Sequence, residues 1–289
     1  MNMKSIKFFL IALTATLLAI PAVSHAQVFS KKEDLKDLNS KTLMVVLENS
    51  SMIDLTIKQA VENEWELSKI AFCDLDKFEK IKTDTSYYFL IRVKGIFKKE
   101  REPAIEFLSL LKGGPEAYMG LDGMYDVLSL PFQTIDDPDG YITPYIDAYI
   151  NIIEAHVLRV QKKKIAATLG LSWYSNRLQE LKNKIVLVNK NDLSELVSEE
   201  SADEMLKGSG KVVEEDVIHE AVDNKKQKIA YTICIGPNVE QQGSYCYKMV
   251  ISADSHDIFY YRKQKVNAKN PKGFLPEDIK KIALPNSIF

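Results

Sequence analysis

The chain alternates between short apolar runs and segments with helical spacing of apolar residues. Residues 42–47 form a continuous apolar run, which is typical of a strand buried on both faces of a sheet. In residues 53–65, apolar side chains recur every three to four positions, which indicates an amphipathic helix. A short strand over 70–72, a helix capped by Asp74 and a strong strand over 86–93 complete the series. This β-α-β-α-β order predicts mostly parallel strands joined by right-handed crossovers.

The same order of elements returns in the second half of the chain. Lys41 precedes Tyr88 by 47 positions, and Lys184 precedes Tyr231 by the same number. The match predicts two similar units with an internal repeat, although the rhythm that unrelated α/β proteins share is an equal alternative. Residues 244–251 and 258–266 then predict an antiparallel meander at the C-terminus.

The stretch that follows residue 93 is mainly helical by its pattern. Residues 103–111 have helical spacing, and 127–132 predict an edge strand because Pro131 cannot donate to a ladder. Residues 142–164 predict the longest helix, and 171–181 predict another. Together the pattern predicts an α/β fold, a layered sandwich built from two similar β-α-β-α-β units.

The long helix over 142–164 is apolar around a wide arc, which predicts burial along much of its circumference. Tyr145, Tyr149 and His156 lie on one stripe of this helix. The stripe has two interpretations, a ligand groove or core packing. Core packing is favoured because aromatic rings commonly bury their bodies and leave their polar tips at the rim.

The N-terminus has the pattern of a secretory signal peptide. Lys4 and Lys7 precede an apolar run over 8–20, and Pro21 interrupts the pattern before the small residues that flank His25. We expect cleavage after residue 26, because the apolar run is shorter than the roughly 20 residues that a bilayer span needs. No further transmembrane span is expected.

These boundaries divide the chain into successive parts. They are the signal peptide 1–26, a flexible leader 27–40, the first α/β unit 41–141, the bridging helices 142–183, and the second α/β unit 184–289 with its C-terminal hairpin.

Charge and metal-binding residues exclude several classes of protein. Loss of Lys4 and Lys7 with the signal peptide changes the formal net charge from −2 to −4, and the only triple-lysine run is 162–164. Nucleic-acid binding is therefore not expected, because it requires many phosphates to be neutralised. The three cysteines and the dispersed histidines lack the spacing of a zinc site, and we expect no metal or cofactor.

Two of the cysteines lie on neighbouring predicted strands. If residues 236–243 form the loop of a hairpin, Ile235 pairs with Tyr245 and Cys234 faces Cys246. An exported protein can keep such a disulfide, but the distance between directly opposed Cβ atoms is wide for one. A pair of buried thiols is the alternative.

No familiar catalytic motif is present. The chain has neither a G-x-S-x-G elbow nor a G-x-G-x-x-G fingerprint, and the glycines at 207–211 lack the spacing of a phosphate loop. The sequence therefore predicts an exported, non-catalytic bacterial protein of the periplasm or cell envelope, peripherally attached or secreted, which binds a protein or a small ligand. The alternative is an exported hydrolase with a dispersed site at the C-terminal ends of the parallel strands, where the sequence places Glu48, Asn49, Asn189 and Lys190. The oligomeric state is not predicted.

Overall fold

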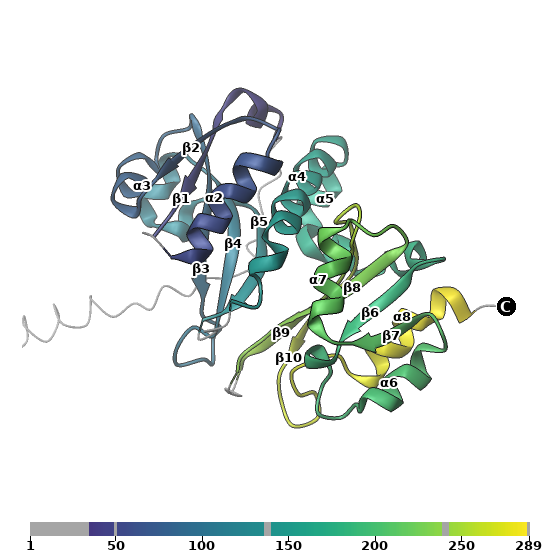
Figure 1. The fold of residues 1–289 in the computed structure, drawn as a ribbon. Helices are drawn as coiled ribbons and strands as arrows, with labels where there is room; N and C mark the ends of the chain where they lie inside the picture. Colours follow the sequence, from purple (N-terminus) through teal and green to yellow (C-terminus); the bar gives the residue numbers. More distant parts are fainter. Residues whose placement is uncertain (1–34, 49–50, 136–139, 239–242, 288–289) are drawn as a thin grey trace, which may run out of the picture.

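The structure is a computed structural model that describes residues 35–48, 51–135, 140–238 and 243–287 (Figure 1). The predicted signal peptide, residues 27–34 of the predicted leader and Asn49 lie outside these ranges. The last six leader residues are not a loose segment. They form a 3-10 helix, Leu35–Ser40, which buries Leu35 and Leu38 in the core.

The two halves of the chain have the same order of elements. The first unit consists of β1 (Thr42–Val46), α2 (Met52–Glu64), β2 (Lys69–Cys73), α3 (Leu75–Ile81), β3 (Tyr87–Gly95), β4 (Ile105–Lys112), β5 (Tyr125–Thr134) and α4 (Ile146–Lys162). The second consists of β6 (Ile185–Asn189), α6 (Glu199–Leu206), β7 (Gly210–Val213), α7 (Glu215–Asp223), β8 (Ile229–Ile235), β9 (Tyr245–Ser252), β10 (Ile258–Lys265) and α8 (Pro276–Ser287). Helix α5 (Lys164–Leu169) and several 3-10 turns connect the units.

Each unit contains one five-stranded mixed sheet. The strand orders are β2-β1-β3-β4-β5 and β7-β6-β8-β9-β10, so that the sheets share one topology. The α/β class is confirmed. The strands are not mostly parallel, however, because each sheet has two parallel pairings and two antiparallel ones, and the antiparallel pairings join its last three strands to one another. The antiparallel meander that the pattern predicts only for the C-terminus is thus present in both units.

The predicted helix over residues 103–111 was wrong. They form most of β4, which pairs with β3 and β5 and is buried over nearly its whole length. An apolar run buried on both faces of a central strand has no alternation, so it is easily mistaken for a buried helix. The predicted edge strand with Pro131 is confirmed as β5. The predicted helix over 171–181 is instead two short 3-10 segments, Gly170–Asn176 and Leu178–Leu181.

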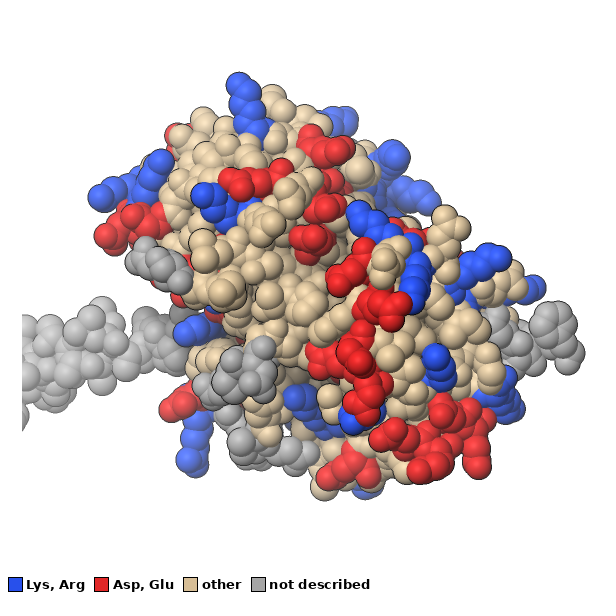
Figure 2. Space-filling view, viewed as in Figure 1, with Lys and Arg blue, Asp and Glu red and all other residues tan. Residues whose placement is uncertain are grey.

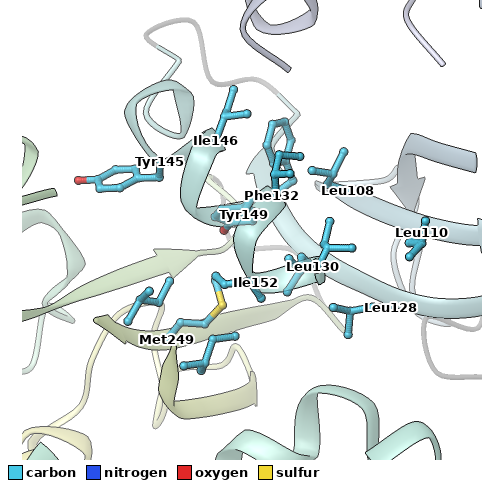
Figure 3. Close-up of a cluster of buried hydrophobic side chains, with 14 of the residues drawn as sticks. Leu108, Leu110, Leu128, Leu130, Phe132, Tyr145, Ile146, Tyr149, Ile152 and Met249 are labelled. Atoms are coloured by element: carbon cyan, nitrogen blue, oxygen red, sulfur yellow. The ribbon is translucent and has the colours of Figure 1, made fainter. Parts of the chain in front are cut away.

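Helix α4 lies between the two sheets and has buried residues around most of its circumference, as its pattern predicts. Against the first sheet, the ring of Tyr149 meets that of Phe132 edge to face, with centroids 5.6 Å apart. Figure 3 shows Ile152 of the same helix beside Met249 of β9, on the second sheet. One helix therefore joins the hydrophobic cores of both units.

Helix α8 is the counterpart of α4 in the second unit. It packs against α6 on one face of the second sheet, as α4 packs against α2 on the first. Its solvent-exposed side carries Lys280, Lys281 and Leu284. Within the described residues, every helix is too short or too polar to cross a bilayer.

Candidate functional site

The tyrosine stripe of α4 does not form a single groove. Tyr145, Tyr149 and His156 are all fully buried. The hydroxyl of Tyr149 donates a hydrogen bond to the Pro131 carbonyl at 2.8 Å, and Nδ1 of His156 lies 3.2 Å from the hydroxyl of Tyr174. Burial, with the nearby Arg159, lowers the pKa of His156 to about 4, so this imidazole is neutral in the folded protein.

Tyr145 differs because its side chain points away from Tyr149, toward the second unit (Figure 3). Its ring stacks on Tyr231 with centroids 5.4 Å apart, and it meets His219 edge to face at 5.3 Å. Tyr141 is a further aromatic neighbour, at 5.8 Å. We call the polar residues gathered here the junction cluster: Tyr141, Tyr145, Asp192, Glu215, His219 and Tyr231.

Asp192 is the buried acid of the junction cluster. Its carboxylate accepts hydrogen bonds from the Thr232 hydroxyl at 2.7 Å, the Cys234 backbone N–H at 3.1 Å and the Tyr141 hydroxyl at 3.2 Å. Burial raises the pKa of Asp192 to about 6 because desolvation outweighs these hydrogen bonds. Asp192 therefore sits close to its titration point near neutral pH, although only 3% of its surface is exposed.

Three buried polar groups in or beside the junction cluster have no hydrogen-bond partner among the described residues. They are the hydroxyls of Tyr145 and Tyr231 and the side-chain amide nitrogen of Asn189. Burial, together with the nearby Glu215, raises the pKa of Tyr145 above its ordinary value, so its hydroxyl keeps its proton. Leaving such a group unsatisfied costs about 1–3 kcal/mol, which makes it a candidate to bind an additional polar molecule.

Glu215 and His219 form the solvent-facing side of the cluster. They are one turn apart on α7, with Oε1 of Glu215 and Nε2 of His219 separated by 3.2 Å. Their side chains are 29% and 30% exposed, whereas Tyr145 behind them is fully buried. The pair therefore lies between solvent and the buried tyrosines.

The topology of the second sheet explains why these residues meet. After β6 the chain crosses to α6 on one face of the sheet, and after β7 it crosses to α7 on the opposite face. The two connections therefore diverge at the carboxyl ends of the neighbouring strands β6 and β7. In an open α/β sheet, ligands usually bind in the crevice at such a point. Lys190 and Glu214 follow these strands and form an ion pair at 2.5 Å.

The strand-end residues named from the sequence have separate roles. Glu48 lies 3.6 Å from Arg92 in the first unit. Asn189 caps a 3-10 turn in the second unit by accepting a hydrogen bond from the Asn191 N–H. No hydrogen bond or ion pair of the described residues joins Glu48 to Asn189 or Lys190, and Asn49 lies outside the described ranges.

Arg92 is the centre of a buried charged network in the first unit. Its guanidinium contacts Asp54 at 3.0 Å and Glu106 at 3.1 Å. Gln133 also donates to Glu106, at 2.8 Å. The opposite charges of the network compensate one another, and we interpret it as structural.

Acidic side chains surround the exposed side of the junction cluster. Figure 2 shows them as a band that runs across α7 toward α6. The exposed members on and beside these helices are Glu199, Glu200, Asp203, Glu204, Glu214, Asp216, Glu220 and Asp223. Asp147 of α4 lies near Asp223 at the end of α7. Burial raises the pKa of Asp147, and the negative charges of Glu64 and Asp223 raise it further. The surface therefore has a negative potential that attracts cations.

The junction cluster offers hydrogen-bond donors and a carboxylate, but it lacks a recognisable nucleophile. Among the described residues, no serine, threonine or cysteine side chain is hydrogen-bonded to a histidine ring. No group of three or more histidine, cysteine or acidic side chains in this part of the chain has the geometry of a metal site. The arrangement is suited to binding a polar ligand.

The predicted pairing of the two cysteines was wrong in register. Ile235 pairs with Tyr247, and Cys234 therefore lies opposite Lys248 instead of Cys246. Both thiols are buried and unbonded in the structure. They lie on the same face of the β8–β9 pair, within one hydrophobic cluster.

Comparisons with known proteins found no match. No family model, no curated protein sequence and no solved structure is similar to this chain. The site must therefore be interpreted from its own geometry.

Proposed function

We propose that this chain is an exported protein of the bacterial envelope that binds a ligand or peptide segment carrying an amine or guanidinium group. The binding position is the junction cluster, with Glu215 and His219 at its entrance. The observation that carries the proposal is the buried, unpartnered hydroxyl of Tyr145 close to Glu215 of the acidic surface, with the ring of Tyr231 stacked on that of Tyr145.

The chemistry of the cluster favours a cationic group over an anionic one. Exposed carboxylates outnumber lysines along α6 and α7, and two nearby lysines, Lys190 and Lys226, are already paired with Glu214 and Glu220. A protonated amine has three donors and no acceptor, which matches carboxylate and phenolic oxygens. The rings of Tyr141, Tyr145 and Tyr231 would add cation–π attraction.

An exported hydrolase is less well supported. Its expected residues at the strand ends are divided between two sheets and are occupied by caps and ion pairs.

Calorimetric titration of the mature chain with spermidine, and with a short polylysine peptide, tests the proposal. We expect binding that weakens as salt is added, and we expect Glu215→Gln and Tyr145→Phe each to lower the affinity about 3- to 30-fold. Tyr145→Phe should change stability little, because it removes a hydroxyl that has no partner.

Two variants provide matched controls. Tyr149→Phe removes a hydroxyl from the same helix and should destabilise the protein by about 1 kcal/mol, through loss of its bond to Pro131, without changing affinity. Asp76→Asn removes one exposed charge from α3 in the first unit and should leave binding unchanged. Absence of binding by every cationic probe, or equal losses in the control variants, would contradict the proposal.

The localisation is tested separately, by expression of the full chain in a Gram-negative bacterium followed by fractionation. We expect the product in the periplasmic or envelope fraction, with an N-terminus at Gln27. A variant with Ile11→Asp and Leu17→Asp should remain in the cytoplasm at full length, because charge in the apolar segment prevents recognition as a signal. Retention of the unaltered chain in the cytoplasm at full length would refute export.

A further inference from the structure

The C-terminal end of helix α4 and the short helix α5 carry exposed apolar side chains. Ile165 and Leu169 of α5 are 59% and 43% exposed and lie one turn apart, whereas Ala166 of the same helix is fully buried. Leu158 of α4 is 39% exposed. The two helices are in contact and lie side by side (Figure 1), so these side chains gather on one part of the surface. Such a gathering of exposed apolar side chains indicates an interaction surface.

Lysines and a tryptophan border these apolar side chains. Lys162 follows Leu158 by one turn of α4, and Lys163 ends the helix; both lysines are exposed. The ammonium of Lys163 lies 5.7 Å from the centroid of the Trp173 ring, which is half-buried against the core. We call the six residues the basic apolar corner: Leu158, Lys162, Lys163, Ile165, Leu169 and Trp173.

The basic apolar corner is positively charged. Within the described part of the chain, neither Lys162 nor Lys163 forms an ion pair. The acidic side chains of the neighbouring 3-10 helices, Asp37 and Glu180, are already paired with basic residues. The corner therefore differs in charge from the acidic band over α6 and α7, and its potential attracts anionic surfaces.

The chain enters the described fold at this corner. The side-chain amide of Gln161, in the last turn of α4, donates hydrogen bonds to the Leu35 carbonyl at 2.9 Å and to the Asn39 side-chain oxygen at 3.1 Å. Residues 1–34 precede Leu35 in the sequence, and they include the apolar run over 8–20 that we expect to direct export. The expected signal segment is therefore attached to the fold beside the basic apolar corner.

We propose that the basic apolar corner binds the surface of a membrane that contains anionic phospholipid. Ile165 and Leu169 insert between the lipid headgroups and the acyl chains, Trp173 lies at the level of the headgroups, and the two lysines bind lipid phosphates. The attachment of the expected signal segment brings the same corner next to the bilayer as the chain is exported. This surface is separate from the junction cluster, and it requires no ligand there.

Sedimentation of the mature chain with lipid vesicles tests the proposal. We expect binding to vesicles of mixed phosphatidylglycerol and phosphatidylcholine, weaker binding as salt is added, and little binding to pure phosphatidylcholine. Lys162→Gln combined with Lys163→Gln should lower the affinity for the mixed vesicles about 10- to 30-fold. Ile165→Ser combined with Leu169→Ser should lower it about 10-fold or more. Both double variants should unfold at nearly the same temperature as the unaltered protein, because they replace exposed side chains.

Two further double variants replace similar side chains elsewhere. Lys280→Gln with Lys281→Gln removes two adjacent exposed lysines from α8, the counterpart of α4 in the second unit. Tyr118→Ser with Met119→Ser removes two exposed apolar side chains from the 3-10 helix Pro115–Met119, on the face of the first sheet opposite α4. Both should bind the mixed vesicles as tightly as the unaltered protein. Absence of binding to the mixed vesicles, equal binding to pure phosphatidylcholine, or an equal loss in these control variants would overturn the proposal.

Tryptophan fluorescence gives a second measurement, which identifies the surface that meets the bilayer. The chain has two tryptophans, so Trp65→Phe leaves Trp173 alone. Mixed vesicles with brominated acyl chains should quench Trp173 in this variant. In Trp173→Phe the emission of Trp65 should not change, because Trp65 is 7% exposed and packed in the core. Vesicles that bind the protein without quenching Trp173 would show that another surface makes the contact, and would refute the proposal.

Discussion

Replacing Asp278 by asparagine should destabilise the protein by about 3–5 kcal/mol, because it leaves a buried lysine without its counter-charge. The Lys248 ammonium lies 2.5 Å from the Asp278 carboxylate, and both side chains are completely covered. Asp278 also accepts hydrogen bonds from the Tyr260 hydroxyl and the Arg262 guanidinium, each at 2.5 Å. The aspartate therefore holds together β9, β10 and the first turn of α8.

Urea unfolding of Asp278→Asn and Glu277→Gln measures this effect. Glu277 is the neighbouring residue, is about half exposed and also pairs with Arg262, so its loss should cost less than about 1 kcal/mol. Lys248→Met should cost less than Asp278→Asn, because the carboxylate retains Tyr260 and Arg262. Similar midpoints for the Asp278 and Glu277 variants would contradict a structural role for the buried pair.

Asp278 also makes the stability of the protein decrease at acidic pH. Burial by itself would raise the pKa of Asp278, but Lys248 and the hydrogen bonds outweigh it and hold this pKa below its ordinary value. A depressed carboxyl pKa contributes stability above the unfolded-state value of 3.8, and this stability is lost as pH falls through the folded-state value.

Stability should also depend on His156 between pH 6.5 and about 4. In the unfolded chain this histidine takes up a proton below 6.5, whereas in the fold it stays neutral until about pH 4. The free energy of unfolding therefore falls by about 1.4 kcal/mol for each pH unit in this window. The loss reaches roughly 3 kcal/mol at the lower end of the window.

Unfolding of the unaltered protein and of His156→Phe at pH 7 and pH 4.5 isolates the contribution of His156 to the pH dependence of stability. The difference in free energy of unfolding between the two proteins should shift by about 2–3 kcal/mol in favour of the variant at the lower pH. Comparison with the variant is needed because Asp126 and Asp192, whose pKa values burial raises to about 6, gain protons in the fold and oppose the effect of His156. Parallel pH profiles would show that His156 titrates normally.

The sequence predicts the helices and strands whose apolar residues follow a regular pattern along the chain. It misses those whose type depends on the strands with which they pair. The runs at β1 and β6 and the wide apolar arc of α4 are visible in the chain, as is the edge position of Pro131. β4 is not, because its apolar run fits a helix until its pairing with β3 is known.

The junction cluster shows a second reason for this limit. Its members come from segments between residues 141 and 231, and the topology of the second sheet and the position of α4 bring them together. Asp192 could have been found by inspecting the residues just after β6. Nothing in the sequence indicates that the hydroxyls of Tyr145 and Tyr231 lack partners, since that depends on which donors and acceptors surround them in the fold.

The position of α4 between the sheets limits how independent the two similar units can be. A fragment that ends at Lys162 would keep this helix on the first sheet but would expose the apolar side that includes Ile152, and the second unit alone would expose Met249 and Tyr231. Both surfaces would favour aggregation. We therefore expect the two similar units to unfold together in one cooperative transition, with neither unit stable on its own.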